Sequence, residues 1–531
     1  MTLTQFLWVL GAIVALGTVV VVAVAIYDIV QRKHAILRNF PVIGHFRYLL
    51  EAIGPELRQY IVTDNDEERP FSRDQRRWVY ASAKTQNNYF GFGTDNDLEL
   101  EPNYLIVKHR AFPLDTPHKD DKGYDPKYSI PCAKILGGYR NRTHAFRPAS
   151  VTYVSAMSFG SLGARAVESL NKGCQISDCL HNTGEGGVSP HHGHGAGLVL
   201  QLGTAYFGSR DKDGRFSLDV LKETLAKFPT VKAIEIKLSQ GAKPGLGGLL
   251  PKEKITAEIA AARGIPMDRD CVSPAGHREF NDADSMLDFV EKIATETGLP
   301  VGIKSAVGEL EFWDELARLC ADTGRSVDFI TIDGGEGGTG AAPLIFADHV
   351  ALPFKLAFAR VYQIFAEHSM QNNIVWNGSA KLGFPDTALF AFALGCDMIG
   401  IARESMLAIG CIQAQRCHTG HCPVGIATHH RWLARGLDPT LKSARLANYM
   451  FSLRKDLLQL SHACGVRHPS LVTTRDFEII DGQLRGQTIQ DLFGYPDGLG
   501  LPSDADQSAI RELMEQHTTA GPRKLAMVGD P

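Results

Sequence analysis

From Val151 to about residue 401 of this 531-residue chain, short apolar segments alternate with amphipathic helical patterns, and this alternation is what most constrains the fold. In one repeat, Asn281 is a candidate N-cap, Gly298 ends the helix, and residues 301–304 follow as a strand. Such a pattern is typical of a parallel sheet with helical crossovers. The expected strands are residues 152–157, 179–183, 232–238, 270–273, 300–304, 328–332, 373–377 and 397–401.

Eight parallel strands separated by helices predict an α/β fold, specifically a closed (β/α)8 TIM barrel. The alternative is a doubly wound open sheet. No G-x-G-x-x-G opens a helix after the first strand, which weakens a dinucleotide-binding interpretation.

Glycine-rich segments with polar neighbours follow several of the expected strands. Glycine lets backbone N–H groups approach an anion closely. One such segment would be an ordinary tight turn, but five at the same end of the strands indicate a binding site. In barrels that end holds the active site, and the loops after strands seven and eight commonly hold a phosphate. The segments are residues 155–160, 182–187, 237–248, 333–340 and 377–383.

Three cysteines form a compact motif after the last expected strand. Cys411, Cys417 and Cys422 have the spacing C-x5-C-x4-C, and Pro423 follows. Three thiolates are too few for an ordinary four-cysteine zinc or [4Fe-4S] site, but they suit a three-iron cluster. A structural zinc site and three packed thiols are the alternatives. The other seven cysteines are scattered, and most are expected to be buried, reduced thiols.

Residues 6–26 carry no charge and are long enough to cross a bilayer as a helix. Four basic residues follow, Arg32, Lys33, Arg38 and Arg47, so the positive-inside rule predicts that the rest of the chain faces the cytoplasm. A cleavable signal peptide, with Ala23-Val24-Ala25 as its cleavage site, and a buried core helix are the alternatives. We expect an uncleaved, single-pass anchor in the cell membrane.

Length and charge bound the remaining possibilities. A formal charge of −4 gives no reason to expect nucleic acid as a partner. The chain is long enough for one barrel with additions. The expected organisation is a transmembrane anchor at 1–30, a small cap or linker at 31–150, the barrel with its cysteines at 151–430, and a helical extension with a flexible tail at 431–531.

Taken together, these motifs resemble the FMN-binding central domain of glutamate synthase over about residues 150–430. The matching segments are Ser155-Ala-Met-Ser-Phe-Gly160, Asn182-Thr-Gly-Glu-Gly-Gly187, Gln240-Gly-Ala-Lys-Pro-Gly245, Asp333-Gly-Gly with Gly338-Thr-Gly-Ala-Ala-Pro343, and the three cysteines. The whole chain resembles the shorter, membrane-tethered glutamate-synthase-like proteins of bacteria.

The chain also departs from that family. It begins Met1-Thr2 and enters the apolar segment, so the family's glutaminase domain with its N-terminal cysteine is expected to be absent, as is the C-terminal β-helix. Asn377-Gly378 stands where the family has two glycines. Because Asn and Gly both tolerate tight turns, FMN binding is still expected.

The resemblance implies an oxidoreductase acting on CH-NH2 donors, with FMN and a [3Fe-4S] cluster as cofactors. In the family, FMN receives electrons through the cluster and gives a hydride to 2-iminoglutarate, which forms from 2-oxoglutarate and ammonia. Ammonia would be free or come from a separate glutaminase subunit, and another subunit could donate electrons. The cluster ligands would be Cys411, Cys417 and Cys422.

Several residues are candidates for holding the flavin. Lys304 ends the fifth expected strand, where a cation would stabilise the reduced flavin. The alternative is a barrel-mouth lysine paired to a carboxylate. Met157 and Ser158 would border the isoalloxazine, as the family's first-strand loop does. The phosphate would bind to backbone amides at the ends of strands seven and eight, namely those of Gly378, Ser379, Gly400 and Ile401.

A second group of residues is expected to act on the substrate. A dicarboxylate needs cations, and Lys237 and Lys243 lie beside Gln240 on one loop. Glu185 could orient ammonia or transfer a proton, or could merely accept loop hydrogen bonds. The segment with His191, His192 and His194 lacks a nearby cluster of acidic or cysteine ligands, so a substrate-loop or surface role is favoured over metal binding.

Two other functions stay open at this point. A flavin dehydrogenase for another amino or oxo acid, passing electrons to a membrane carrier, would explain the anchor. A cofactor-bearing scaffold without turnover is disfavoured by the polar residues of the loops.

Overall fold

The computed structural model describes residues 2–519, and the chain divides into two units, residues 1–75 and 76–531. The first unit holds helix α1 (Leu3–Val30), the short helix α2 (Ala35–Asn39), helix α3 (Gly44–Leu57) and a π-helical turn (Arg58–Val62). With a mean hydropathy of 2.9, α1 is long and apolar enough to cross a membrane. A signal sequence would meet the same criteria, so the uncleaved anchor stays a prediction.

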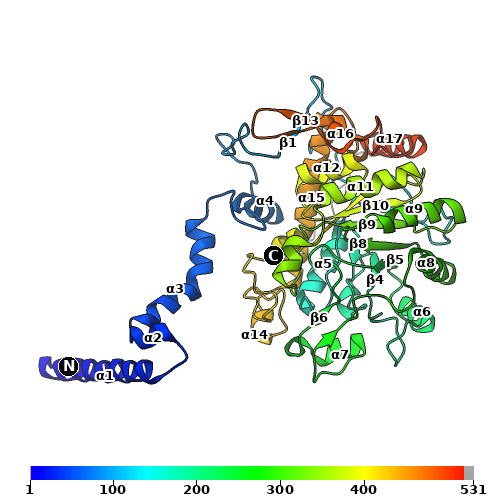
Figure 1. The fold of residues 1–531 in the computed structure, drawn as a ribbon. Helices are drawn as coiled ribbons and strands as arrows, with labels where there is room; N and C mark the ends of the chain where they lie inside the picture. Colours follow the sequence, from blue (N-terminus) through cyan, green and yellow to red (C-terminus); the bar gives the residue numbers. More distant parts are fainter. Residues whose placement is uncertain (1, 520–531) are drawn as a thin grey trace. The chain divides into compact units, whose positions relative to one another are not determined.

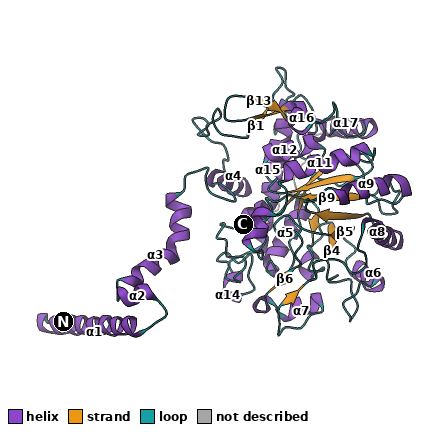
Figure 2. Cartoon of the chain, in the orientation of Figure 1, coloured by secondary structure: helices purple, strands orange, loops and turns teal. Residues whose placement is uncertain are grey.

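The second unit is built on a closed barrel of eight parallel strands, which confirms the predicted fold class (Figure 1). Around the barrel the strands follow one another in chain order, and the last pairs with the first. Figure 2 shows helices surrounding these strands. The strands are β2 (Thr152–Val154), β3 (His181–Asn182), β4 (Leu198–Leu202), β5 (Val231–Lys237), β8 (Val301–Ser305), β9 (Phe329–Asp333), β10 (Val375–Ser379) and β11 (Met398–Ile401).

The remaining helices belong to the second unit, except that α4 begins just before its first residue. They are α4 (Arg73–Ala83), α5 (Ala164–Ile176), α6 (Leu218–Lys227), α7 (Ala257–Arg263), α8 (Ala283–Thr297), α9 (Glu311–Thr323), α10 (Leu344–His349), α11 (Phe354–Glu367), α12 (Pro385–Leu394), α13 (Arg403–Ala408), α14 (Arg431–Ala434), α15 (Pro439–Ala463), α16 (Ile489–Phe493) and α17 (Asp504–Thr519).

One of the eight expected strands was wrong. Residues 270–273 are not in the barrel, because β7 (Cys271–Val272) pairs antiparallel with β6 (Leu249–Leu250) in a separate hairpin. The missing barrel strand is β4, which follows β3 with only a 3-10 turn between them. The prediction assumed an α-helix between every two barrel strands, so it missed a strand whose connection to the previous strand has no α-helix.

The repeat chosen to illustrate the pattern is nearly as expected. The N-cap of α8 is Asp282 rather than Asn281, and its carboxylate accepts a hydrogen bond from the Ser285 backbone nitrogen at 2.8 Å. Gly298 ends the helix in the left-handed region, with φ of 70°, which glycine adopts without strain. The error is one residue, because Asn and Asp are equally good N-caps.

A segment of the predicted cap closes the amino end of the barrel. Cys132 and Leu136 are buried in one cluster with Val199 and other inward-facing strand residues. The Lys134 ammonium lies 3.0 Å from a carboxylate oxygen of Asp397, which directly precedes β11, and both side chains are buried. Arg142 Nε lies 3.0 Å from Oδ2 of Asp328, the residue directly before β9. This segment is therefore part of the barrel's core.

The two ends of the second unit meet in a small sheet. β1 (Tyr104–Val107) pairs with β12 (Phe477–Ile480), which pairs with β13 (Gly486–Thr488). The predicted flexible tail begins near Gly494, yet it contains helix α17 and the buried Tyr495, whose hydroxyl donates to the Leu394 carbonyl at 3.1 Å. Residues 520–531 of that tail lie outside the described residues.

Acid should destabilise the second unit through His468, which is buried in its neutral form. Its Nε2 donates to the Pro131 carbonyl at 2.8 Å, and its Nδ1 accepts from the Ser470 nitrogen. Burial lowers the pKa of His468 to about 4. An unfolded histidine binds its proton near pH 6.5, so the unfolded state holds more protons between pH 6.5 and 4. The free energy of unfolding should therefore fall by roughly 3 kcal/mol as pH drops through that window.

Urea unfolding in detergent at several pH values measures this effect. His468→Gln should be less stable at neutral pH but show a shallower loss on acidification, whereas His118→Gln, at an exposed position, should keep the original slope. Identical slopes for all three proteins would contradict the assignment.

Candidate active site

Alternate residues of each barrel strand face the interior and form three levels. On β5, Ala233 lies in the apolar cluster at the closed end, Glu235 in a polar level above it, and Lys237 at the carboxyl rim. The period of two places equivalent residues of neighbouring strands at the same height. The rim is therefore where charged side chains from several strands meet.

The middle level is organised by Glu235, which is 1% exposed. Its carboxylate accepts hydrogen bonds from Asn182 Nδ2 at 2.8 Å, Gln201 Nε2 at 2.6 Å and Thr331 Oγ1 at 2.8 Å. Asn377 Nδ2 in turn donates to Thr331 Oγ1 at 3.2 Å. A buried carboxylate needs such partners. Sequence reasoning missed this level, although an acidic residue inside an expected strand was a signal for it.

Lys237 pairs with Glu185 across the rim. The Lys237 ammonium lies 2.9 Å from Glu185 Oε1 and donates to Gln240 Oε1 at 2.6 Å. Burial alone would raise the pKa of Glu185, but the charges of Lys237 and Lys243, with a direct hydrogen bond from Lys237, hold it below its ordinary value. Glu185 is therefore ionised at neutral pH.

Lys243 joins this group from the same loop. Its ammonium donates to the Gly247 carbonyl at 3.1 Å, and the side chain is buried. Burial lowers the pKa of Lys243, and the charge of Lys237 lowers it further while Glu185 opposes both. The structure thus brings together all four predicted substrate residues, Glu185, Lys237, Gln240 and Lys243.

A further cation, Arg263 at the end of α7, was missed. It is buried, and its guanidinium donates to the Phe159 carbonyl at 3.1 Å and lies 5.1 Å from the Phe207 ring centre. Its charge contributes to the lowered pKa of Glu185. The segment between β5 and β8 that contains α7 was not predicted to lie outside the barrel, because residues 270–273 were assigned to a barrel strand.

Lys304 lies on the neighbouring rim position and pairs with Asp333. The Lys304 ammonium is 3.2 Å from Asp333 Oδ1, and Asp333 Oδ2 accepts from the Gly241 nitrogen at 2.8 Å. Burial would lower the pKa of Lys304, but Asp333 and Glu235 raise it above the ordinary lysine value. Lys304 is therefore a charged ammonium at the rim. Its pairing with Asp333 is the alternative interpretation given for this lysine from the sequence.

The predicted phosphate residues converge where β10, β11 and β2 lie side by side. Ser379 Oγ, ending β10, is 3.2 Å from Ser155 Oγ, directly after β2. Gly378 is in register with Ile399, and the Ile401 carbonyl accepts from the Ser155 nitrogen at 3.0 Å. A Cβ on Gly400 would lie 2.9 Å from the Tyr153 ring. Two hydroxyls and glycine backbone at one rim position fit a phosphate.

Met157 and Ser158 lie in the loop after β2, against the loop after β3. A Cβ on Gly184 would lie 2.5 Å from the Ser158 nitrogen, and Gly184 has φ of 67°, so only glycine allows this approach. Both side chains are buried. The loop that carries Glu185 is thus fixed against the loop predicted to border the flavin.

The three cysteines lie in one loop after α13. Burial, together with the nearby Cys417 and Cys422, raises the pKa of Cys411 to about 11. The Lys254 ammonium donates to the Cys417 carbonyl, and its charge interacts with Cys417 and Cys422. The donor set, three neighbouring thiols beside a buried cation, fits an anionic thiolate cluster. Within residues 2–519 no three His, Cys, Asp or Glu side chains already stand at metal-ligand geometry.

The histidine segment has other partners. His191 Nε2 lies 2.7 Å from Glu258, and His192 is buried with its Nδ1 accepting from the Ser189 nitrogen at 3.1 Å. Burial lowers the pKa of His194. Because His192 is fully buried, a surface role does not describe it, and the substrate-loop role of this segment stays a prediction.

The model of a protein family described as "Conserved region in glutamate synthase" matches residues 140–467, which is more than half of the chain. A glutamate synthase large subunit-like protein of Bacillus subtilis, YerD, is 37% identical over 485 residues, covering 86% of this chain and 92% of that protein. The chain belongs to the glutamate synthase family. The prediction of a glutamate-synthase-like oxidoreductase is thereby confirmed at the level of the family.

Other glutamate synthases match a smaller part. An archaeal glutamate synthase [NADPH] of Methanocaldococcus jannaschii is 35% identical over 319 residues, covering 59% of this chain and 58% of that protein. Among solved structures, mandelate oxidase with benzoyl-formic acid has a TM-score of 0.40 at 14% identity, covering 72% of this chain and 86% of that one. At that score the likeness adds nothing to the barrel seen in the strand pairing.

The glutamate synthase match extends beyond the region recognised by motifs, which ended near residue 430. It includes α15, which lies along α5 and buries Tyr449 and Met450. The Tyr449 hydroxyl donates to the Gly383 carbonyl at 2.7 Å, in the loop after β10. The matched region therefore includes the helix that supports the predicted phosphate loop.

Proposed function

We propose that this chain is an FMN- and iron–sulfur-dependent oxidoreductase that makes glutamate from 2-oxoglutarate and ammonia. The observation that carries the proposal is the charge at the barrel rim. The cations Lys237, Lys243 and Arg263 all act on one carboxylate, Glu185. An excess of buried positive charge suits a substrate with two carboxylates, because each charge then has a partner.

Each rim residue has a role in this reaction. Lys237 and Lys243 would bind the substrate carboxylates, with Gln240 holding the Lys237 ammonium in position. Glu185, ionised at neutral pH, would accept a proton from ammonium and orient the ammonia. 2-Oxoglutarate and ammonia then lose one water to form an imine, and two electrons with two protons convert its C=N bond to the amine of glutamate.

FMN, when bound, would supply these two electrons after receiving them through the iron–sulfur cluster. Ser379 and Ser155, with the backbone at Gly378, Gly400 and Ile401, would hold its phosphate. Lys304 would stabilise negative charge on the reduced ring, and Met157 with Ser158 would border it. Cys411, Cys417 and Cys422 would ligate a [3Fe-4S] cluster.

Partners and location complete the proposal. One relative is named as large subunit-like, which supports a separate subunit that delivers ammonia or electrons here too. Residues 1–30 would anchor the protein, with the four basic residues after α1 keeping the barrel in the cytoplasm. Residues 31–150 would link the anchor to the barrel, residues 151–430 would carry both cofactors, and residues 431–531 would form the extension.

A second candidate follows from α1 itself. Glutamate synthesis from soluble substrates needs no membrane, whereas a flavin dehydrogenase of another amino or oxo acid could pass electrons to a membrane carrier. The decisive experiment reduces the purified protein and screens oxo acids, with ammonium or glutamine, for reoxidation of its flavin. Reoxidation by 2-oxoglutarate with ammonium supports the first candidate. Reoxidation only by another oxo acid supports the second.

Ser379→Asp should weaken FMN binding roughly 10–100-fold, because a carboxylate beside the phosphate costs about 1.4–2.8 kcal/mol. Flavin retained after dialysis, identified by acid release and chromatography, measures this. Ser369→Asp is the matched control, since it is exposed and precedes β10 at the other end of the strand. FAD in the wild type, or equal FMN retention in both variants, would contradict the assignment.

A further inference from the structure

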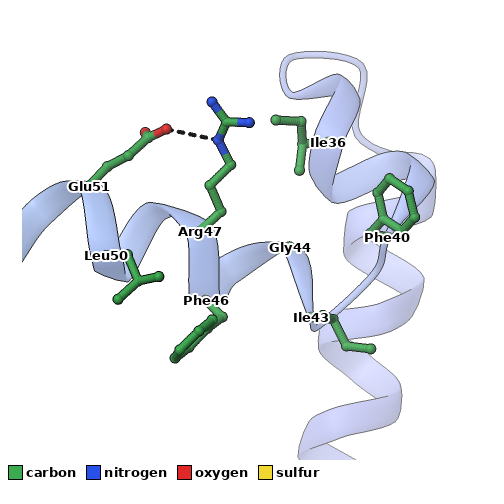
Figure 3. Close-up of a pocket in the computed structure, with 8 residues that line it drawn as sticks. All are labelled: Ile36, Phe40, Ile43, Gly44, Phe46, Arg47, Leu50 and Glu51. Atoms are coloured by element: carbon green, nitrogen blue, oxygen red, sulfur yellow. Dashed lines mark hydrogen bonds and ion pairs between the residues drawn. The ribbon is translucent and has the colours of Figure 1, made fainter.

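Helix α3 of the first unit has an apolar face that no described residue covers. Ile43, Phe46, Leu50, Ile53 and Leu57 are all exposed, Phe46 by 61%. Their spacing of three or four residues puts them on one side of the helix. Figure 3 shows Phe46 and Leu50 on one side of α3 and the Arg47–Glu51 pair on the other. The helix is therefore amphipathic and presents its apolar side outward.

A fixed turn connects α3 to the apolar helix α1. Asp28, in the last turn of α1, is fully buried. Its carboxylate accepts from the Val42 nitrogen at 2.9 Å and lies 3.0 Å from His45 Nε2. Residues 6–26 of α1 span about 30 Å at 1.5 Å per residue, which matches the hydrocarbon core of a bilayer. Asp28 and the start of α3 would then lie at the membrane surface.

Apart from the buried Asp28, the charged residues between α1 and the start of α3 are basic. From Gln31 to Arg47 the chain has four Lys or Arg residues and no Asp or Glu. Within residues 2–519, Arg47 is the one of these four that has a carboxylate partner, Glu51, at 2.8 Å. Basic residues beside a membrane span are attracted to anionic lipid headgroups. An exposed apolar helix face next to such charges is the pattern of a helix that lies in the membrane interface.

We propose that α3 lies in the interface of the leaflet where α1 ends, with Phe46 and Leu50 among the acyl chains and the basic residues on anionic headgroups. The proposal rests on α1 being a membrane span and is independent of the chemistry in the barrel. Its occupant is an anionic lipid surface rather than a second protein.

Site-specific photocrosslinking of the full chain in nanodiscs tests the proposal. p-Benzoylphenylalanine at Phe46 should label lipid, and labelling should rise several-fold when phosphatidylglycerol is added to phosphatidylcholine. The same group at Ala52, which is exposed and lies about 120° around the helix from Phe46, is the matched control and should label lipid weakly. A combined Arg32→Gln, Lys33→Gln, Arg38→Gln variant should lose the dependence on phosphatidylglycerol.

Several results would overturn the proposal. Crosslinks from Phe46 to a second copy or to another protein would mean that the apolar face is a protein interface. Equal lipid labelling from Phe46 and Ala52 would mean that α3 has no fixed orientation. Failure of the chain to enter nanodiscs would remove the membrane span as well. Flavin content, measured in the same samples, tells each of these failures apart from a failure of the barrel chemistry.

Discussion

Replacing Cys417 with serine is expected to remove essentially all cluster iron while leaving most of the FMN. Three thiolates are the minimum for a three-iron cluster, so the loss of one leaves an iron without its protein ligand. The predicted phosphate residue Ser379 ends β10, whereas Cys417 lies in the loop after α13, so the flavin should be little affected. Steady-state turnover with an external donor should fall with the iron.

Iron and acid-labile sulfide analysis of wild type and variant, with flavin measured on the same samples, checks this result. Cys320→Ala is the matched control, because Cys320 is buried in α9 away from the loop and should retain iron. Zinc in place of iron in the wild type would refute the cluster. Iron retained by Cys417→Ser would refute its ligands.

The fold was largely readable from sequence because barrel strands are short, apolar and bounded by glycine. Gly298 is an example: the glycine predicted the end of α8, and in the structure it is the left-handed C-cap of that helix. The failures share one cause. β4 follows β3 without an α-helix, and the β6–β7 hairpin imitates a strand where a crossover should be. The periodicity of apolar residues indicates whether a segment is a helix or a strand, but not which strands pair with each other in the sheet.

The residues of the candidate site were predictable where they belong to motifs at the strand ends, but their pairings with residues from other elements were not. Lys237, Gln240 and Lys243 are close in sequence, so their convergence was expected. Arg263 reaches the same carboxylate from α7, and Asp333 reaches Lys304 from the next strand. The first contact depends on how the segment with α7 folds back onto the barrel, and the second on the register of neighbouring strands, neither of which the linear sequence contains.

The second large effect is expected from Lys237→Met, which removes the ammonium but keeps much of the side-chain volume. The Lys237–Glu185 pair is mostly buried, with side chains 10% and 21% exposed. Leaving one member of such a pair unpartnered costs about 3–4 kcal/mol. If that loss falls on the transition state, kcat/KM for 2-oxoglutarate should drop roughly 10²–10³-fold.

The pH dependence gives this prediction a second measurement. In the wild type, Lys237 helps to hold the pKa of Glu185 below its ordinary value, so Glu185 stays ionised into the acid range. Without the ammonium, burial raises the pKa of Glu185, and the acid limb of kcat/KM should move to higher pH. Lys222→Ala, which breaks a half-exposed surface pair with Glu296, should change neither quantity. A normal rate and an unmoved acid limb in Lys237→Met would show that the pair takes no part in the reaction, and the dehydrogenase of another oxo acid would then be the better account of the same barrel.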